Sequence, residues 1–406
     1  MTQEQIKKIF NDTAYIRTSG TPEELKTAEY IATECRKIGL EPVIEAFDVE
    51  MSNVHYATLT IDGKEIPCKG YRLCGTGEIE APLYYMTTTD KTALRGAKGK
   101  IVLLDTAVRY WLYQDLVEAG AVGFITYTNN ANYPDDDIDD KELRPHVHKG
   151  NKLLGVNLNV KSVVEIVKNN GKTAKISISQ EEYTGQSHNV ILDMPGESDE
   201  VIVFSAHYDT TPLSQGAYDN MSGSVGLLGI AEYFTTHPHK RSLRFVWCGS
   251  EERGLLGSKA YVADHEEELE NIVLNINLDM IGCTMGNFFA CCTTEQKTVS
   301  YIDYFALETG TPMKVQQDVY SSDSTPFADK GIPAISFARH SPMNVAEIHN
   351  RYDTKEIIKP ENMLLDIDFI SKFSERMANA VHCPVAREIP ENMKEKLDIY
   401  LNRKRK

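Results

Sequence analysis

Short apolar runs alternate along most of the chain with segments whose apolar residues recur at helical spacing. The run VIVFSA, which starts at Val201, is rich in β-branched residues and too short for a membrane span, as is typical of a strand buried on both faces. After a polar loop, Ser222 is predicted to cap a helix in which Val225, Leu228 and Phe234 mark one face. This loop therefore joins the carboxyl end of a strand to the start of a helix, which is where open α/β sheets bind ligands.

The same alternation predicts the other elements of an α/β fold. Thr21, Pro22 and Glu24 form a capping-box pattern that predicts a helix ending near Gly39, and a strand is expected at 43–51. Further strands are expected at 189–196, 200–209, 243–252, 272–280 and 332–338, and helices near 222–236, 254–265 and 297–309. Strands that alternate with helices predict a largely parallel mixed sheet with helices on both faces.

From about residue 54 the sequence pattern changes to short segments typical of strands, separated by turn residues. One stretch, GAKGKIVLLDTAVRYWLYQDLVEAGAVGFITYTN, resembles the protease-associated domain, which implies a lid, a substrate filter or an interaction surface. The acidic run 135–140 is expected to be a solvated loop. The predicted organisation is an N-terminal part of the main domain (1–53), a smaller β-rich insert (54–185), the rest of the main, catalytic domain (186–384) and a charged C-terminal helix or tail (385–406).

Composition narrows the classes of function. The chain has 406 residues, is 41% hydrophobic and 25% charged, and has a formal net charge of -16, which argues against nucleic acid or an anionic membrane as a partner. Its N-terminus lacks an apolar signal region, and no apolar run is long enough to span a bilayer, so a soluble, cytoplasmic protein is expected. The eight cysteines form no C-x-x-C pair and are expected to be free thiols. The sequence leaves the oligomeric state open, and an oligomer is possible.

Potential metal ligands follow three of the predicted strands and occur again in a later loop. They are His207, Asp209, Asp219, Glu251, Glu252, Asp279 and His349. A parallel sheet would bring them to one edge, where imidazole and carboxylate groups suit Zn²⁺, with Co²⁺ or Mn²⁺ as substitutes, and a carboxylate midway in the set can bridge two ions. Each residue alone is more often an ordinary loop or turn residue, but accidental convergence of the whole set is the less favoured explanation.

Five motifs follow one another within residues 186–384: AHYDT, GAYDNMSGS, SEERGLLGS, NLDMIG and HNRYDT. In these the sequence resembles zinc-dependent aminopeptidases with a co-catalytic two-metal site, relatives of bacterial leucyl aminopeptidase and glutamate carboxypeptidase. The resemblance implies a zinc-peptidase fold that binds two Zn²⁺ ions per chain. By that resemblance Asp219 bridges both ions. His207 and Asp279 complete one site, and Glu252 and His349 complete the other.

The resemblance also implies catalytic roles. Glu251 is left beside the ligands, where a glutamate suits a general base that takes a proton from the bridging water and passes it to the leaving amine. Asp209 is expected to orient the imidazole of His207, and Asp353 to support the other side of the site. Tyr320 is expected to stabilise the tetrahedral oxyanion.

These expectations predict a hydrolase, a zinc metallopeptidase acting as an exopeptidase, and most directly an aminopeptidase with peptide substrates. A carboxypeptidase or small-amide deacylase of the same fold stays open, and it would need arginines such as Arg339 and Arg351 to hold a substrate carboxylate. A non-catalytic interaction scaffold is the alternative of another class. Such a scaffold would be expected to have lost ligands or the base, whereas all of them are present here.

Overall fold

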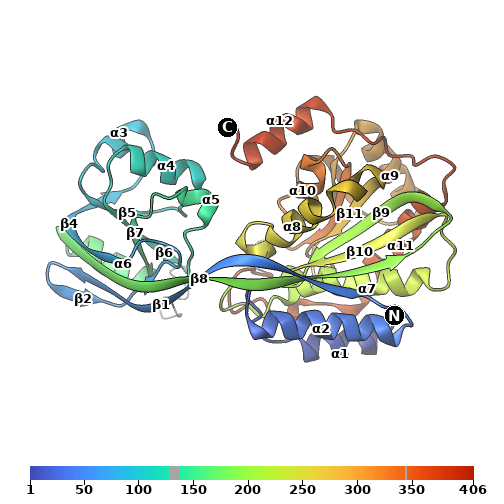
Figure 1. Cartoon of the computed structure of the whole chain (residues 1–406), viewed down its shortest axis with the longest axis horizontal. Helices are drawn as coiled ribbons and strands as arrows, with labels where there is room; N and C mark the ends of the chain where they lie inside the picture. Colours follow the sequence, from blue (N-terminus) through green and yellow to red (C-terminus); the bar gives the residue numbers. More distant parts are fainter. Residues whose placement is uncertain (129–137, 343–344) are drawn as a thin grey trace. The chain divides into compact units, whose positions relative to one another are not determined.

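The computed structural model describes residues 1–128, 138–342 and 345–406 and divides the chain into two compact units (Figure 1). The first unit comprises residues 1–49 and 186–404 together with Lys406, and the second comprises residues 50–185 together with Arg405. The chain passes between the units within two long strands, β1 (Val43–Ile61) and β8 (Thr173–Met194). No helix among the described residues is both long and apolar enough to cross a bilayer.

The first unit is built on a mixed sheet. Its strands follow the order β13 (Lys314–Gln317), β12 (Asn287–Thr293), β14 (Ala334–His340), β11 (Ile272–Leu278), β9 (Ser198–His207), β10 (Arg241–Cys248) and the end of β8. The central pairs β9–β10, β9–β11 and β11–β14 are parallel, whereas β8–β10 and β12–β14 are antiparallel. The predicted largely parallel mixed sheet is confirmed.

Helices cover both faces of this sheet. They are α1 (Gln3–Asp12), α2 (Pro22–Lys37), α7 (Ser222–Phe234), α8 (Leu256–Asp264), α9 (Gln296–Thr309), α10 (Ser324–Asp329), α11 (Pro360–Asn379) and α12 (Glu391–Tyr400). In Figure 1, α1 and α2 lie on the opposite side of the strands from α8 and α10. Neighbouring residues of β9 point into hydrophobic cores on opposite faces of the sheet. Phe204 packs in the core that contains α7, and Val203 packs in the core that contains α8 and α10. This explains why the strand has no polar face.

Two local predictions need comment. The helix expected after Thr21 is present, and Oγ1 of Thr21 accepts the N–H of Glu24 at 3.3 Å. The prediction that Ser222 caps α7 is wrong, because Ser222 itself, with φ of -61° and ψ of -47°, and Met221 before it already have helical backbone angles. The hydroxyl of Ser222 instead donates to the carbonyl of Tyr218 at 2.7 Å and accepts the N–H of Ile281 at 3.0 Å. All eight cysteines are free, as expected.

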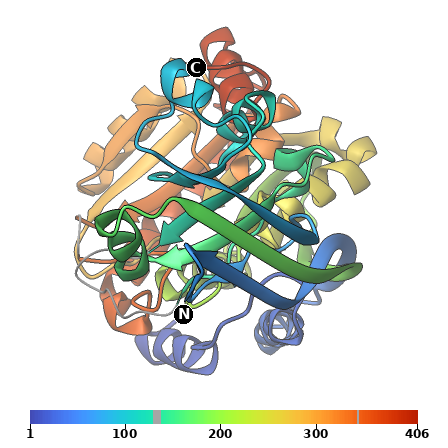
Figure 2. The same ribbon diagram turned by 90° about the vertical axis from the view of Figure 1, so that its left-hand side faces the viewer.

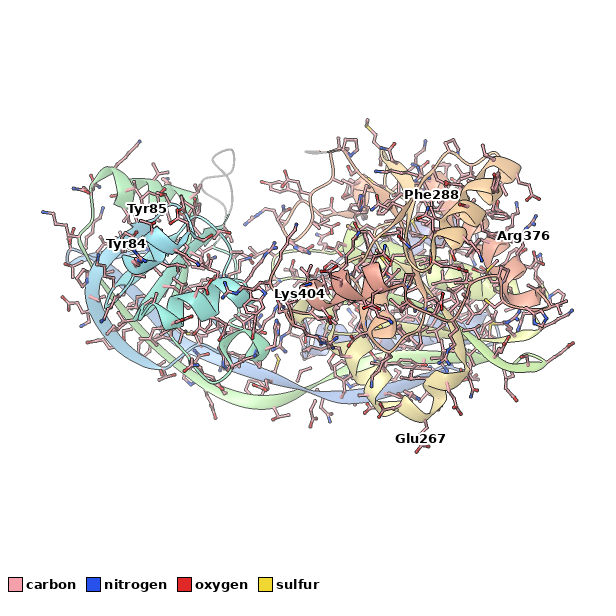
Figure 3. The ribbon with its side chains drawn as sticks, turned by 90° about the horizontal axis from the view of Figure 1, so that it is seen from above. Tyr84, Tyr85, Glu267, Phe288, Arg376 and Lys404 are labelled. Carbon is pink, nitrogen blue, oxygen red and sulfur yellow. The ribbon has the colours of Figure 1, made fainter. Side chains whose placement is uncertain are left out.

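The second unit has its own sheet and core. Its strands are the start of β8, β4 (Gly77–Met86), β5 (Ile101–Leu104), β6 (Gly123–Thr128), β7 (Leu154–Asn159) and β3 (Lys69–Gly70), with β2 (Lys64–Ile66) beside β1. Its helices are α3 (Lys91–Arg95), α4 (Tyr110–Glu118), α5 (Pro145–His148) and α6 (Val160–Lys168). Figure 2 shows these strands, in blue to green, side by side, and Figure 3 shows Tyr84 and Tyr85 of β4. Residues 135–137 of the acidic run lie outside the described residues.

Candidate metal centre

The carboxyl ends of three parallel strands meet at one edge of the first unit's sheet. His207 is the last residue of β9, and in the register of the sheet it stands beside Cys248, the last residue of β10. Asp279 directly follows β11. Glu251 and Glu252 open a short 3₁₀ helix, η2 (Glu251–Arg253), just beyond β10. The convergence predicted from the sequence is therefore present in the fold.

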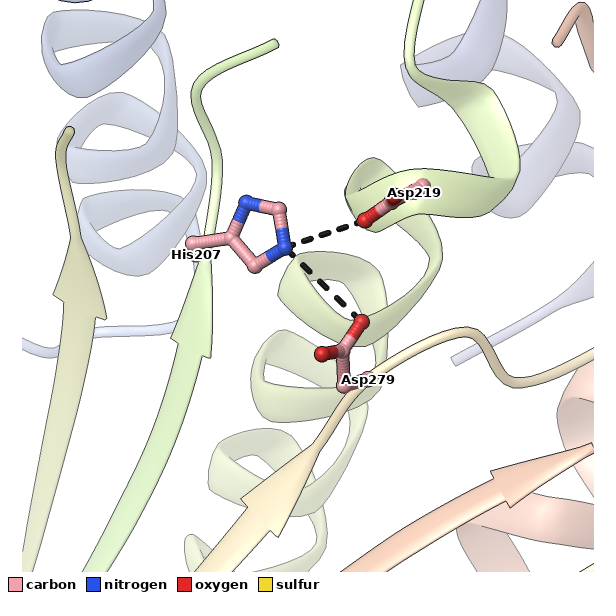
Figure 4. Close-up of side chains that lie close together, drawn as sticks. All are labelled: His207, Asp219 and Asp279. Atoms are coloured by element: carbon pink, nitrogen blue, oxygen red, sulfur yellow. Dashed lines mark ion pairs between the residues drawn. The ribbon is translucent and has the colours of Figure 1, made fainter. Parts of the chain in front are cut away.

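The first ligand group consists of His207, Asp219 and Asp279 (Figure 4). Nε2 of His207 lies 3.1 Å from Oδ1 of Asp219 and 3.7 Å from Oδ1 of Asp279. All three side chains are buried. Each comes from a different segment of the chain, so the group exists only in the folded protein.

The second ligand group consists of His349, Asp219 and Glu252. Nε2 of His349 lies 3.0 Å from Oδ2 of Asp219 and 3.3 Å from Oε2 of Glu252. Asp219 thus offers one carboxylate oxygen to each histidine. The side chain of His349 is 51% exposed, so this group opens toward the surface while the first is enclosed.

The donor atoms fit a metal ion such as Zn²⁺. Ligands about 2.0–2.1 Å from a tetrahedral zinc lie roughly 3.3 Å from one another, and the measured separations lie on both sides of that value. Oδ1 of Asp279 is buried and has no hydrogen-bond partner among the described residues. A buried carboxylate oxygen without a partner is unfavourable, and coordination to a cation would satisfy it.

The charges in the two ligand groups also favour a bound cation. Burial alone would lower the pKa of His349, but Glu252 and Asp219 outweigh burial and raise this pKa to about 11. Burial is likewise outweighed at His207, where Glu251, Asp209, Asp219 and Asp279 raise the pKa well above its usual value. The surrounding carboxylates thus favour the charged form of each imidazole, and a cation bound at the same place would compensate their negative charge in the same way.

Two further carboxylates hold the backbone of the ligand groups. Asp209 lies 3.4 Å from Nδ1 of His207, and it accepts the N–H groups of Glu251 at 2.9 Å and Glu252 at 3.2 Å. Asp353 accepts the N–H of Asp219 at 3.0 Å and that of the residue before it at 2.7 Å. Asp353 thus supports the shared carboxylate from the main chain.

Glu251 belongs to neither ligand group among the described residues. Burial raises its pKa well above the usual value, and the neighbouring charge of Glu252 adds to this effect. The hydroxyl of Tyr320 is 3.4 Å from Nε2 of His340, a residue outside both ligand groups. Burial raises the pKa of Tyr320, and the negative charge of Asp279 raises it further, so the phenol keeps its proton.

Two buried charged residues near the site were missed in the sequence. Arg17 is fully buried, and its guanidinium donates to the carbonyl oxygens of Gln215 at 2.6 Å and Gly216 at 2.7 Å, in the loop between His207 and Asp219. Nothing in its sequence context marks it. Glu24 is also fully buried, and the only signal in the sequence, the capping-box spacing, points to a different role.

Comparison with known proteins shows what this chain is similar to. Residues 189–372 match the family model of peptidase family M28. Aminopeptidase YwaD of Bacillus subtilis (strain 168) is 28% identical over 362 residues, which cover 84% of this chain and 75% of the relative.

Solved structures of similar fold extend over nearly the whole chain. The structure of BSAP, a zinc aminopeptidase from Bacillus subtilis, matches with a TM-score of 0.76 and 25% identity, covering 96% of this chain and 97% of that one. An aminopeptidase from Aneurinibacillus sp. strain AM-1 matches with a TM-score of 0.77 and 22% identity, covering 95% and 96%, which supports the fold alone. Residues 189–372 thus match peptidase family M28, and the chain is similar to an aminopeptidase and to a zinc aminopeptidase of Bacillus subtilis.

Proposed function

We propose that this protein is a zinc-dependent aminopeptidase that removes N-terminal residues from peptides and holds two Zn²⁺ ions. The observation that carries the proposal is the position of Asp219, whose two oxygens lie 3.1 Å from Nε2 of His207 and 3.0 Å from Nε2 of His349. Asp279 would complete one site, and Glu252 the other. Co²⁺ or Mn²⁺ could replace zinc with the same ligands.

The bound ions would supply Lewis acidity, which polarises a scissile carbonyl and lowers the pKa of water. Glu251 is the group of this chain left to move protons. As general base it would take a proton from the attacking water and deliver it to the amine that leaves, and burial, which raises the pKa of Glu251, helps it to hold that proton between the two steps. Tyr320, whose phenol stays protonated, would donate a hydrogen bond to the developing oxyanion. Asp209 would fix the position of both His207 and Glu251.

The surroundings of Arg339 argue against a carboxypeptidase that would bind the substrate carboxylate with this arginine. Its Nε donates to Asp366 at 3.0 Å, its Nη1 donates to the carbonyl of Gly286 at 3.1 Å, and its guanidinium lies over the ring of Phe288, which is labelled in Figure 3. An arginine occupied in this way has little left to offer a substrate carboxylate. The relatives named above are aminopeptidases as well.

We also propose that residues 54–185 form a protease-associated-like insert without catalytic residues. Among the described residues, both groups suited to hold a metal lie in the first unit. The insert would then filter or hold substrates. A variant lacking it that still binds zinc should lose rate on long peptides more than on dipeptides, and equal losses would contradict this role.

The test of the main proposal is a panel of peptides offered to the zinc-loaded protein, with each sequence present both free and N-acetylated. Mass spectrometry should show sequential loss of N-terminal residues from the free peptides alone, and removal of metal by a chelator should stop it. Cleavage of acetylated peptides from the C-terminus would replace the aminopeptidase by a carboxypeptidase. No cleavage at full zinc loading would overturn the proposal.

A further inference from the structure

Ser250, the residue before Glu251, has an unusual backbone conformation. Its φ of 55° and ψ of 30° are left-handed, which residues with a side chain avoid unless surrounding contacts hold them. The chain needs this conformation because it turns here from the end of β10 into η2. Whatever holds Ser250 therefore also fixes the direction in which Glu251 leaves the turn.

The contacts that hold Ser250 come from the N-terminal segment. Oε1 of Glu24, on α2, accepts the N–H of Ser250 at 3.2 Å and the hydroxyl of Ser187 at 2.6 Å. Its Oε2 accepts the N–H of Gly20 at 2.6 Å. The hydroxyl of Ser250 is hydrogen-bonded to the hydroxyl of Ser19. Both polar groups of Ser250 that can donate a hydrogen bond are thus engaged by residues 19–24.

The residue before Ser250, Gly249, is tightly surrounded by Glu24 and two neighbouring groups. A Cβ at Gly249 would lie 2.8 Å from Oε1 of Glu24, 2.6 Å from Oγ of Ser187 and 2.4 Å from the carbonyl oxygen of His188. The carbonyl of His188 and the side chains of Ser187 and Glu24 together occupy the space of any side chain at this position. Glycine is therefore required directly before Ser250, and Glu24 is one of the three groups that require it.

Three successive main-chain N–H groups donate to the buried carboxyl groups of two residues. Ser250 donates to Glu24, whereas Glu251 and Glu252 donate to Asp209. Asp209 holds the turn from the side of the ligand groups, and Glu24 holds it from the side of α2. The capping-box role is not what Glu24 does, because its carboxylate contacts Gly20, Ser187 and Ser250.

We propose that Glu24 is a positioning residue for Glu251, acting through the backbone of Ser250. The inference rests on the proposed function, in which Glu251 is the general base. Glu24 touches neither substrate nor reacting atoms. Its loss should therefore lower kcat by misplacing the base, while substrate binding, measured as KM, changes little.

The test compares Glu24→Leu and Glu24→Gln with Glu29→Gln, an exposed glutamate on the same helix. Glu24→Leu should lower kcat about 10–100-fold at full zinc loading and keep KM within about twofold, because a small displacement of a reacting group has this effect. Glu24→Gln keeps the shape and one acceptor oxygen, so it should retain more of kcat than Glu24→Leu. Glu29→Gln should match the unaltered protein.

A second readout does not depend on activity. In metal-free protein, hydrogen exchange of a peptide covering residues 249–255 should become faster in Glu24→Leu and stay unchanged in Glu29→Gln. If Glu24→Leu does not fold, Glu24→Gln decides on the same readouts. Unchanged kcat and unchanged exchange in a folded Glu24 variant would overturn the proposal, as would a loss of kcat matched by an equal loss of bound zinc. If the unaltered protein cleaves no peptide, the proposed function fails, while the exchange measurement still tests the link between Glu24 and Ser250.

Discussion

Asp209 accepts the main-chain N–H of Glu251, with 2.9 Å between Oδ1 and the amide nitrogen. The same oxygen lies 3.4 Å from Nδ1 of His207. One buried carboxylate therefore connects a candidate metal ligand with the candidate general base. Replacing it should disturb both the affinity for metal and the rate of the reaction.

We expect Asp209→Asn to weaken zinc binding and to lower kcat, each by about 10–100-fold, the range typical of residues that orient metal ligands. Asparagine has the same shape as aspartate, but its NH₂ group would replace one of the two oxygens that accept the N–H groups of Glu251 and Glu252. One of these two hydrogen bonds would therefore be lost. Zinc affinity by competition with a chelator and kcat on a dipeptide substrate measure the two effects. Asp199→Asn, at an exposed aspartate before β9's apolar run, is the matched control. Wild-type affinity and rate in Asp209→Asn would contradict the assignment.

Arg17→Lys should lower the melting temperature and the affinity for zinc. The guanidinium of Arg17 donates to Gln215 and Gly216 within the loop that separates two candidate ligands, and a single ammonium group does not reproduce this fork. Differential scanning fluorimetry with and without zinc tests the effect. Arg36→Lys, at an exposed arginine of α2, should change neither quantity. A zinc-dependent rise in melting temperature that is the same in Arg17→Lys and the unaltered protein would argue against this role.

The metal-free protein should become less stable as the pH rises from about 4 to about 8. Burial raises the pKa of Asp353 to about 7 and that of Glu24 to about 8. The folded chain thus keeps protons that the unfolded chain has released, so raising the pH through this window favours unfolding. His349 acts with the same sign, because its pKa is raised to about 11 and its stabilising proton is lost as the pH rises.

Melting temperatures of chelator-treated and zinc-loaded protein at pH 5, 6.5 and 8 check this dependence. The metal-free protein should melt at its lowest temperature at pH 8. The gain from zinc should be largest there, because fewer protons then compete with the metal for the ligand groups. A metal-free protein that melts higher at pH 8 than at pH 5 would contradict the pKa directions.

The ion pair of Arg339 and Asp366 is expected to be structural. Asp366 is buried, and Arg339→Met would leave its carboxylate without a charged partner, which costs about 3–5 kcal/mol when one member of a buried pair is removed. Urea unfolding should show this loss, and the preference for free N-termini should stay unchanged. A variant that unfolds like the unaltered protein but has a strongly raised KM would show that Arg339 faces the substrate.

The parts of the fold that the sequence predicted are those with strong local patterns. The apolar run before His207 and the periodic residues of α7 marked a strand and a helix, and the order of strand ends then indicated which side chains converge. Ser222 was misplaced because its hydroxyl is used by a turn that local propensity does not reveal. Glu24 and Arg17 act through backbone groups nearly 200 residues or more away in the chain. Such partners become visible only in the folded structure.

The central claim is that Glu251 moves the proton in a reaction at the two ligand groups. The most direct test measures kcat and bound zinc in Glu251→Gln, which keeps the size of the side chain and removes its capacity to accept a proton. We expect zinc content equal to that of the unaltered protein and kcat lower by about 10²–10⁴-fold on a free dipeptide, as for loss of a general base. Full turnover in the zinc-loaded variant would contradict the account.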